Sequence, residues 1–182
     1  MAIRLKPIKD QVIVITGASS GIGLATALEA ARRGARVVLA SRDEADIKKA
    51  ADQIVAEGGQ ATPVVVDVGD QASMEALAEQ AIVAYGRIDT WVNNAGVSIY
   101  GRIEEVPLDD AQRLFETNYW GVVHGSLAAL PHLKQRSGAL INVGSELSET
   151  AIPLQGHYAA SKHAVKGSPT RCASSFTRRA RP

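Results

Sequence analysis

A tyrosine and a lysine lie one helical turn apart near the end of the chain, in the segment YAASK. Because Tyr158 and Lys162 are four residues apart, a helix would place them on one face. A phenol with a pKa of about 10 is a poor acid–base catalyst at neutral pH, but a nearby ammonium favours its phenolate form. Taken alone, the pair is better explained as the surface of an amphipathic helix. Its chemical meaning depends on what the rest of the chain supplies.

A glycine-rich segment, TGASSGIG at 16–23, follows the first apolar run of the chain. Gly17 would permit a sharp turn, Gly21 a close approach of the backbone to a ligand, and Gly23 close packing of the next helix. Backbone N–H groups and the positive end of that helix would then face one point, which suits a pyrophosphate. A plain glycine-rich connector is the alternative. The place of the segment, after a strand and before a helix in the first βαβ unit, favours a dinucleotide site.

Five short apolar runs alternate with helical patterns, which is typical of a parallel sheet covered by helices on both faces. The sequence predicts strands at 11–16, 35–40, 61–66, 88–94 and 138–144, and helices at 21–34, 43–59 and 70–86. A longer helix is expected from 108 to 130, because prolines stand at both ends of that segment. The 182 residues fit one domain. We therefore expect an α/β fold of the doubly wound, Rossmann type.

Three segments together resemble the short-chain dehydrogenase/reductase family: TGASSGIG, NNAG at 93–96 and YAASK at 158–162. Three motifs in order are far more specific than any one of them. The resemblance covers residues 8–167. It implies hydride transfer between a nicotinamide cofactor and a small carbonyl or alcohol substrate, by a protein whose full-length relatives form homo-oligomers.

The resemblance also implies roles for individual residues. Tyr158 would donate its proton to a carbonyl oxygen as hydride arrives, and Lys162 would also hold the nicotinamide ribose. Ser145 would hydrogen-bond the substrate oxygen as charge develops, and Asn118 would hold a water in the proton relay. The predicted cofactor-binding residues are Gly17, Ser19, Ser20, Gly21, Ile22, Gly23, Ser41, Arg42, Asp67, Val68, Asn94, Ala95, Gly96, Tyr158 and Lys162. Two of these have plainer alternatives: Ser19 and Ser20 could only cap the helix.

The choice between NADP(H) and NAD(H) depends on the end of the second strand. An acid there accepts hydrogen bonds from the adenosine ribose and repels a 2′-phosphate, whereas an arginine attracts the phosphate. The family's acid position holds Ser41, followed by Arg42. Asp43 would favour NAD(H), but it is better explained as the cap of the following helix. We therefore expect NADP(H). Asp67 matches the family's adenine contact, with a simple turn residue as its alternative.

The composition excludes several other classes of protein. No apolar run reaches the roughly 18 residues that a membrane helix needs, and the start of the chain has no secretory apolar region. A single cysteine fits a reducing cytosol, so we expect a cytoplasmic protein. No histidine has metal-ligand spacing. Outside residues 168–182 the chain holds 16 basic and 19 acidic residues, a net charge of −3, so nucleic acid is not an expected partner.

Residues 168–182 break the pattern, with four arginines, no acid and no apolar period. With suitable codons, one added base before codon 168 changes this segment to FTDALRVELHAPRAP, which would continue the helix that carries Tyr158. We therefore hypothesise a single-base frameshift there, by mutation or by sequencing error; an arginine-rich tail for an acidic partner is the alternative. A chain truncated in this way would lack the family's last strands and substrate loop. It would be expected to show little or no turnover, and a homo-oligomer is expected of the full-length relatives but is in doubt for such a chain. The alternative function is thus a non-catalytic nucleotide-binding remnant.

Overall fold

The computed structural model describes residues 6–168 of the chain, and these residues form two compact units. The sheet unit comprises residues 6–95 and 121–143, and the helical unit comprises residues 96–120 and 144–168. The segment on which the frameshift hypothesis rests lies, from residue 169 onward, outside the described residues.

The sheet unit is built on five parallel strands in the order β3-β2-β1-β4-β5. β1 pairs with both β2 and β4, so the order reverses direction beside the first strand, where doubly wound sheets bind their ligands. The strands and helices of this unit are β1 (Val12–Thr16), α1 (Gly21–Arg32), β2 (Arg36–Ser41), α2 (Glu44–Ala56), β3 (Gln60–Val65), α3 (Gln71–Tyr85), β4 (Thr90–Asn93), α5 (Gly121–Arg136) and β5 (Ala139–Asn142), preceded by the short helix η1 (Ile8–Asp10). The predicted α/β fold with a parallel sheet is confirmed.

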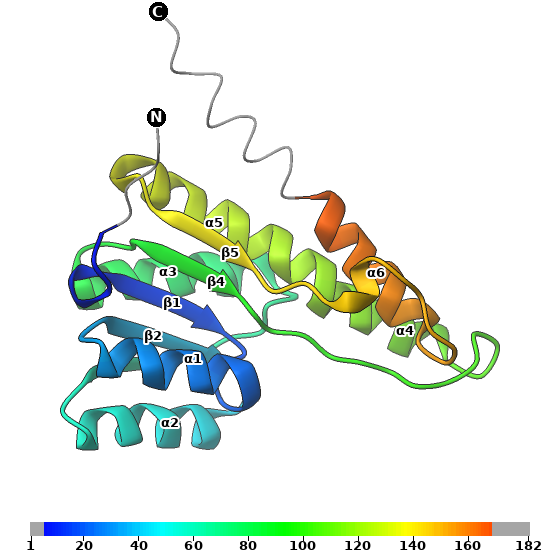
Figure 1. The fold of residues 1–182 in the computed structure, drawn as a ribbon, viewed down its shortest axis with the longest axis horizontal. Coiled ribbons are helices and arrows are strands. Elements are labelled where there is room, and N and C mark those ends of the chain that lie inside the picture. The colour runs from blue at the N-terminus through cyan, green and yellow to red at the C-terminus, as the bar shows by residue number, and fades with distance from the viewer. Residues whose placement is uncertain (1–5, 169–182) are drawn as a thin grey trace, which may run out of the picture. The chain divides into compact units, whose positions relative to one another are not determined.

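Helices cover both faces of this sheet (Figure 1). On one face, α1 and α2 pack against the first two strands through a buried cluster that includes Ala27, Leu39 and Ile54. On the other face, α3 and α5 pack through a second cluster that includes Leu77 and Trp91. The consecutive apolar residues of β1, β2 and β4 supply both clusters, because neighbouring side chains of a strand point to opposite faces.

The helical unit contains no strand among its described residues. It consists of α4 (Leu108–Phe115), η2 (Glu116–Trp120), η3 (Glu146–Ser148) and α6 (Gly156–Gly167), with the connecting segments. η2 is a π-helical segment that lies between α4 and α5 in the chain. Such segments are rare and occur often at functional sites.

The expected helix from 108 to 130 is therefore wrong in two respects. Five π-helical residues interrupt it, and α5 continues through Pro131 to Arg136. Pro131 removes the N–H that would bond the carbonyl of Leu127. Leu127 lies on an exposed side of α5, where water can replace that bond, so the helix tolerates the proline.

β5 lies at the edge of the sheet, next to β4 alone among the described strands. Its residues are only partly buried, and Ile141 is exposed.

Candidate active site

The glycine-rich loop between β1 and α1 is held in a shape that favours glycine at three positions. Gly17 has a φ of +64°, and a Cβ there would come within 2.7 Å of the Cα of Ala95. A Cβ on Gly23 would lie 2.2 Å from the carbonyl oxygen of Gly17. The loop therefore folds back closely on the first turn of α1. Gly21 also has a positive φ, +54°, but a Cβ there would contact nothing within 4 Å, which leaves this part of the loop open to a ligand.

Thr16 and Asn94 brace this loop from the ends of β1 and β4. The Thr16 hydroxyl accepts hydrogen bonds from the backbone N–H groups of Asn94 and Ala95, both at 3.1 Å. The amide of Asn94 donates to the carbonyl oxygens of Thr16 and Gly17, both at 3.0 Å. Both amide hydrogens of Asn94 are thus used within the protein. The side chains of Thr16 and Asn94 therefore hold the loop in place. The sequence did not reveal this role for Thr16.

The two loop serines differ in their hydrogen bonds. Ser20 is the N-cap residue of α1, but its side chain makes no capping hydrogen bond. Capping by Ser20, the plainer alternative for this residue, is therefore wrong. Ser19 lies 3.0 Å from the hydroxyl of Ser41, at the end of β2. The Ser20 hydroxyl is left available to an anion at the positive end of α1.

Asp43 is the N-cap residue of α2, as expected. Its carboxylate accepts a hydrogen bond of 2.8 Å from the backbone N–H of Asp46. Arg42 is exposed, and no residue of the described part of the chain forms an ion pair with it. The end of β2 therefore presents a hydroxyl from Ser41 and an unpaired guanidinium, while the nearest acid is used by a helix.

Asp67 and Val68 follow β3. The carboxylate of Asp67 accepts a hydrogen bond of 2.9 Å from the N–H of Gly69, which is the geometry of a local turn. Val68 is buried, and its carbonyl oxygen lies 3.2 Å from Nδ1 of His124 on α5. Asp67 thus shapes the turn after β3, and its predicted contact with adenine stays a prediction.

In the helical unit, Tyr158 and Lys162 both lie on α6, in the first half of the helix. Nζ of Lys162 lies 5.8 Å from the centre of the Tyr158 ring, within range of a cation–π contact. Lys162 is only 4% exposed, and burial lowers the pKa of its ammonium from the ordinary value. The structure thus places the two side chains together and removes one of them from water.

Asn118 lies in η2 and is completely buried. Its amide oxygen accepts from the N–H of Val97 at 2.8 Å, and its amide nitrogen donates to the carbonyl of Val97 at 2.8 Å. The same nitrogen donates to the hydroxyl of Ser161 at 3.1 Å. Both hydrogens of the amide are therefore used, so its side chain has no donor left for the relay water that we expect near this residue.

Ser145 is the N-cap residue of η3. Its hydroxyl oxygen accepts a hydrogen bond of 3.1 Å from the N–H of Leu147, and its own N–H donates to the hydroxyl of Ser148 at 3.2 Å. Because the Ser145 oxygen is an acceptor in this bond, its hydrogen can still be donated to another oxygen. The side chain is thus oriented by the backbone and keeps the donor that its predicted role needs.

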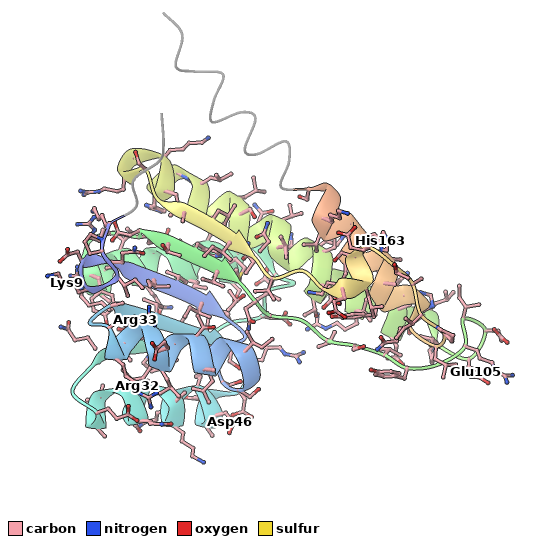
Figure 2. The ribbon with its side chains drawn as sticks, in the orientation of Figure 1. Lys9, Arg32, Arg33, Asp46, Glu105 and His163 are labelled. Carbon is pink, nitrogen blue, oxygen red and sulfur yellow. The ribbon has the colours of Figure 1, made fainter. Side chains whose placement is uncertain are left out.

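Neither histidine beside the tyrosine–lysine pair takes part in these arrangements. His163, labelled on α6 in Figure 2, lies with Nδ1 at 2.8 Å from the carbonyl oxygen of Ala159, one turn earlier in the same helix. His157 directly precedes Tyr158, and its Nε2 is buried without a hydrogen-bond partner among the described residues.

The structure therefore assembles the predicted residues in two groups. The sheet unit brings together the glycine loop, Ser41, Arg42, Asp67, Val68, Asn94 and Ala95, with Ile22 68% exposed on the first turn of α1. The helical unit holds Asn118, Tyr158 and Lys162 on two helical segments and Ser145 at the start of a third. The predicted residue Gly96 is the first residue of this unit and directly follows Ala95. Sequence reasoning missed Thr16 and Ser161. The only signal for Ser161 is a serine in the middle of a helical segment, directly before Lys162.

Two further kinds of site are absent from the described part of the chain. Within residues 6–168, no three His, Cys, Asp or Glu side chains are grouped so as to hold a metal ion. No helix in that range is both long and apolar enough to cross a membrane.

Known proteins resemble the chain over most of its length. It is 48% identical to the uncharacterized oxidoreductase YxnA of Bacillus subtilis over 167 residues, which are 91% of this chain and 47% of YxnA. It is 40% identical to the probable oxidoreductase EphD of Mycobacterium tuberculosis over 158 residues, which are 86% of this chain and 27% of EphD. The chain thus spans about half the length of the first of these relatives and about a quarter of the second.

Two solved structures share the fold. One is a short-chain dehydrogenase/reductase from Burkholderia phymatum in complex with NAD, with a TM-score of 0.89, 34% identity, and coverage of 92% of this chain and 60% of that one. The other is an alcohol dehydrogenase from Thermococcus sibiricus complexed with 5-hydroxy-NADP, with a TM-score of 0.84, 32% identity, and coverage of 86% and 67%.

The sequence model of the family described as short chain dehydrogenase matches residues 11–179. This match extends beyond residue 167, where the resemblance carried by the sequence motifs ends. It includes the glycine loop, the bracing Asn94 and the helix with Tyr158 and Lys162. The chain belongs to the short-chain dehydrogenase family.

Proposed function

We propose that the protein is an oxidoreductase that transfers a hydride between NADP(H) and a small carbonyl or alcohol substrate, with Tyr158 as the general acid and base. The observation that carries this proposal is the burial of Lys162 beside the Tyr158 ring. Lysine is almost never fully buried unless it is paired or used, because removing an ammonium from water is costly. A buried lysine beside a tyrosine, in a chain of this family, supports a catalytic pair.

In the reducing direction, Tyr158 gives its phenolic proton to the substrate oxygen as the carbonyl carbon becomes an alcohol carbon. The Lys162 ammonium stabilises the phenolate that is left. Ser145 donates its free hydrogen to the same substrate oxygen, on which negative charge develops. A bound nicotinamide cofactor would supply the hydride, and with it both electrons. In the oxidising direction, the Tyr158 phenolate takes up the alcohol proton.

The residues of the sheet unit fit a dinucleotide. The open backbone at Gly21, the uncapped hydroxyl of Ser20 and the N-terminal end of α1 together suit a pyrophosphate. The family resemblance assigns the nicotinamide ribose to Lys162, which belongs to the helical unit. These features are common to NAD(H) and NADP(H) and do not separate the two.

NADP(H) is favoured by the end of β2. A 2′-phosphate would meet the exposed guanidinium of Arg42 and the hydroxyl of Ser41, and no carboxylate stands in the position that would repel it. Asp43 is engaged in capping α2 and so competes less for the ribose hydroxyls of NAD(H).

The test begins with the gene, resequenced across codon 168, because residues 168–182 bear on the alternative function. The protein that the gene encodes is then purified, and binding of NADPH and NADH is measured by calorimetry. Oxidation of NADPH is followed with a panel of aldehydes and ketones. Carbonyl-dependent oxidation supports the proposal. Tight cofactor binding without turnover on any substrate, in either direction, supports the nucleotide-binding remnant instead.

A further inference from the structure

We propose that Ser161 is a positioning residue that fixes the turn of α6 between Tyr158 and Lys162 against Asn118 of η2. This inference rests on the proposed function, since it assigns Ser161 a part in the same reaction. Ser161 is not expected to touch substrate or cofactor; it acts through its two neighbours on the helix.

The first observation is the pair of hydrogen bonds that Ser161 makes. Its hydroxyl donates to the carbonyl oxygen of Tyr158 at 2.7 Å and accepts from the amide nitrogen of Asn118 at 3.1 Å. Ser161 is completely buried, so water cannot replace either bond. A helical serine that only satisfied itself would need the first bond alone. The second bond joins α6 to a segment 43 residues earlier in the chain.

The second observation is that Asn118 is itself firmly held. Both the N–H and the C=O of Val97 bond its amide, at 2.8 Å each, and Asn118 is also completely buried. Its amide plane is therefore fixed before it reaches Ser161. Three hydrogen bonds in series then connect the backbone of Val97 to the backbone of Tyr158.

The geometry of α6 makes this connection relevant to the reacting groups. Ser161 lies three residues after Tyr158 and one before Lys162. Its hydrogen bond to Asn118 therefore holds the single helical turn that carries both Tyr158 and Lys162. A shift of this turn would move the phenol and the ammonium together. Misplacement of reacting groups by about 1 Å can cost about a hundredfold in rate.

The experiment compares Ser161→Ala, which removes both bonds, with Ser161→Thr, which keeps the hydroxyl. Ala160→Ser is the matched control, because Ala160 is the exposed neighbour on the same helix. We expect kcat of S161A to fall by about ten- to a hundredfold with KM for the carbonyl within about twofold. S161T should recover most of the loss, and A160S should equal the wild type. If S161A does not fold, Ser161→Cys replaces it, and its weak thiol donor should leave kcat below that of S161T.

The dependence of kcat on pH separates positioning from a purely structural role. If the Lys162 ammonium no longer lies beside the phenol, the charge nearest to the reacting oxygen has moved, and the pH profile of kcat in S161A should differ in shape from that of the wild type. A loss of folded protein alone would lower kcat by the same factor at every pH. A pH profile of the same shape in S161A and wild type, or equal kcat values for the alanine and threonine variants, overturns the proposal.

A second readout does not depend on turnover. Exchange of the side-chain amide protons of Asn118 with solvent, followed by NMR, should be at least about tenfold faster in S161A than in wild type and A160S, because one buried N–H loses its acceptor. If the wild type oxidises no NADPH, the proposed function fails. The exchange comparison then still tests the hydrogen bond between Ser161 and Asn118 by itself. Equal exchange rates in S161A and wild type contradict the proposal that this hydrogen bond holds Asn118 and α6 together.

Discussion

The sheet unit and the helical unit bury different chemistry. Both hydrophobic clusters of the described residues fall in the sheet unit. The helical unit buries few apolar side chains among its described residues: Ala111, Leu114, Ala159 and Val165. Its other buried side chains are polar: Thr117, Asn118, Ser148, Gln155, Ser161 and Lys162. One unit is stabilised by non-directional burial, whereas the other depends on hydrogen bonds with defined partners.

This difference separates the two tasks of the proposed site. In the sheet unit, the candidate cofactor loop is formed mainly by backbone, shaped by glycines on a rigid apolar layer. In the helical unit, side chains carry the proposed reaction, and polar bonds such as Gln155 to Ser98, at 3.0 Å, fix the segments that bear them. Substitutions in the sheet unit should therefore act on stability or cofactor affinity. Substitutions in the helical unit should act on kcat.

The largest expected effect is in the helical unit. Tyr158→Phe removes the proton that the proposed mechanism transfers, and kcat should fall about a thousandfold. Affinity for NADPH, which depends mostly on the sheet unit, should change by less than about threefold. Stopped-flow turnover and calorimetric binding measure the two quantities. A large loss of binding in Y158F would contradict the separation of tasks.

For Gly23→Ala, in the sheet unit, the quantity expected to change is the affinity for the cofactor. Its Cβ would lie 2.2 Å from the carbonyl of Gly17, so the loop must shift, and affinity for NADPH should fall about a hundredfold. The control is Gly167→Ala, because a Cβ at that position meets nothing within 4 Å. Equal affinities for the two variants, measured by calorimetry, would show that the loop does not bind the cofactor.

Leu77→Ala tests the apolar core of the sheet unit. Leu77 is fully buried on α3, and its truncation should lower the free energy of unfolding by about 2–5 kcal/mol. Val83→Ala on the same helix, where the side chain is 88% exposed, should change it by less than about 0.5 kcal/mol. Denaturant titration measures both, and kcat per folded molecule should stay the same in each.

Arg42→Ala tests the choice of cofactor. Loss of one charge-assisted contact to the 2′-phosphate should weaken NADPH binding about tenfold or more and leave NADH binding unchanged. Lys49→Ala, which removes another exposed cation of the same region, is the control. An equal effect of R42A on both cofactors would refute a 2′-phosphate contact.

The smallest expected effect is on stability, because the buried ammonium of Lys162 lowers the free energy of unfolding. Burial lowers its pKa from 10.5, so the folded chain releases this proton at a lower pH than the unfolded chain. Between these two pKa values the unfolded chain holds more protons, and the contribution of Lys162 to stability rises with pH. Below that window the folded chain bears the full cost of the buried ammonium. Lys162→Met should therefore be inactive but more stable than wild type at pH 7, and the difference should shrink as the pH approaches 10.5. A difference in unfolding free energy that does not vary with pH would contradict this.

The sheet unit could be predicted almost completely from the sequence. Its five strands and the helices α1, α2 and α3 differ from the predicted ranges by a few residues at most, because runs of β-branched residues, helical periods and glycine stops are local signals. The exception is α5, which was predicted only as part of a longer helix from 108 to 130. The capping role of Asp43 was predicted for the same reason, since it depends on residues three positions apart.

The hydrogen bonds that join distant segments within the helical unit could not be predicted in this way. Asn118, Tyr158 and Lys162 were predicted from motifs, but the bonds from Asn118 to Val97 and Ser161 join residues 21 and 43 positions apart. Nothing in the local pattern indicates which distant segments meet. The π-helical segment was missed because its residues, ETNYW, have no helix breaker and continue the pattern of α4.

The central claim is that Tyr158 protonates a carbonyl substrate while the protein holds NADP(H). The most direct measurement compares carbonyl-dependent oxidation of NADPH by the wild type and by Y158F, each saturated with cofactor. The account predicts turnover by the wild type and about a thousandfold less by the variant. Equal rates for the two proteins, or bound NADPH that no aldehyde or ketone oxidises, would contradict it.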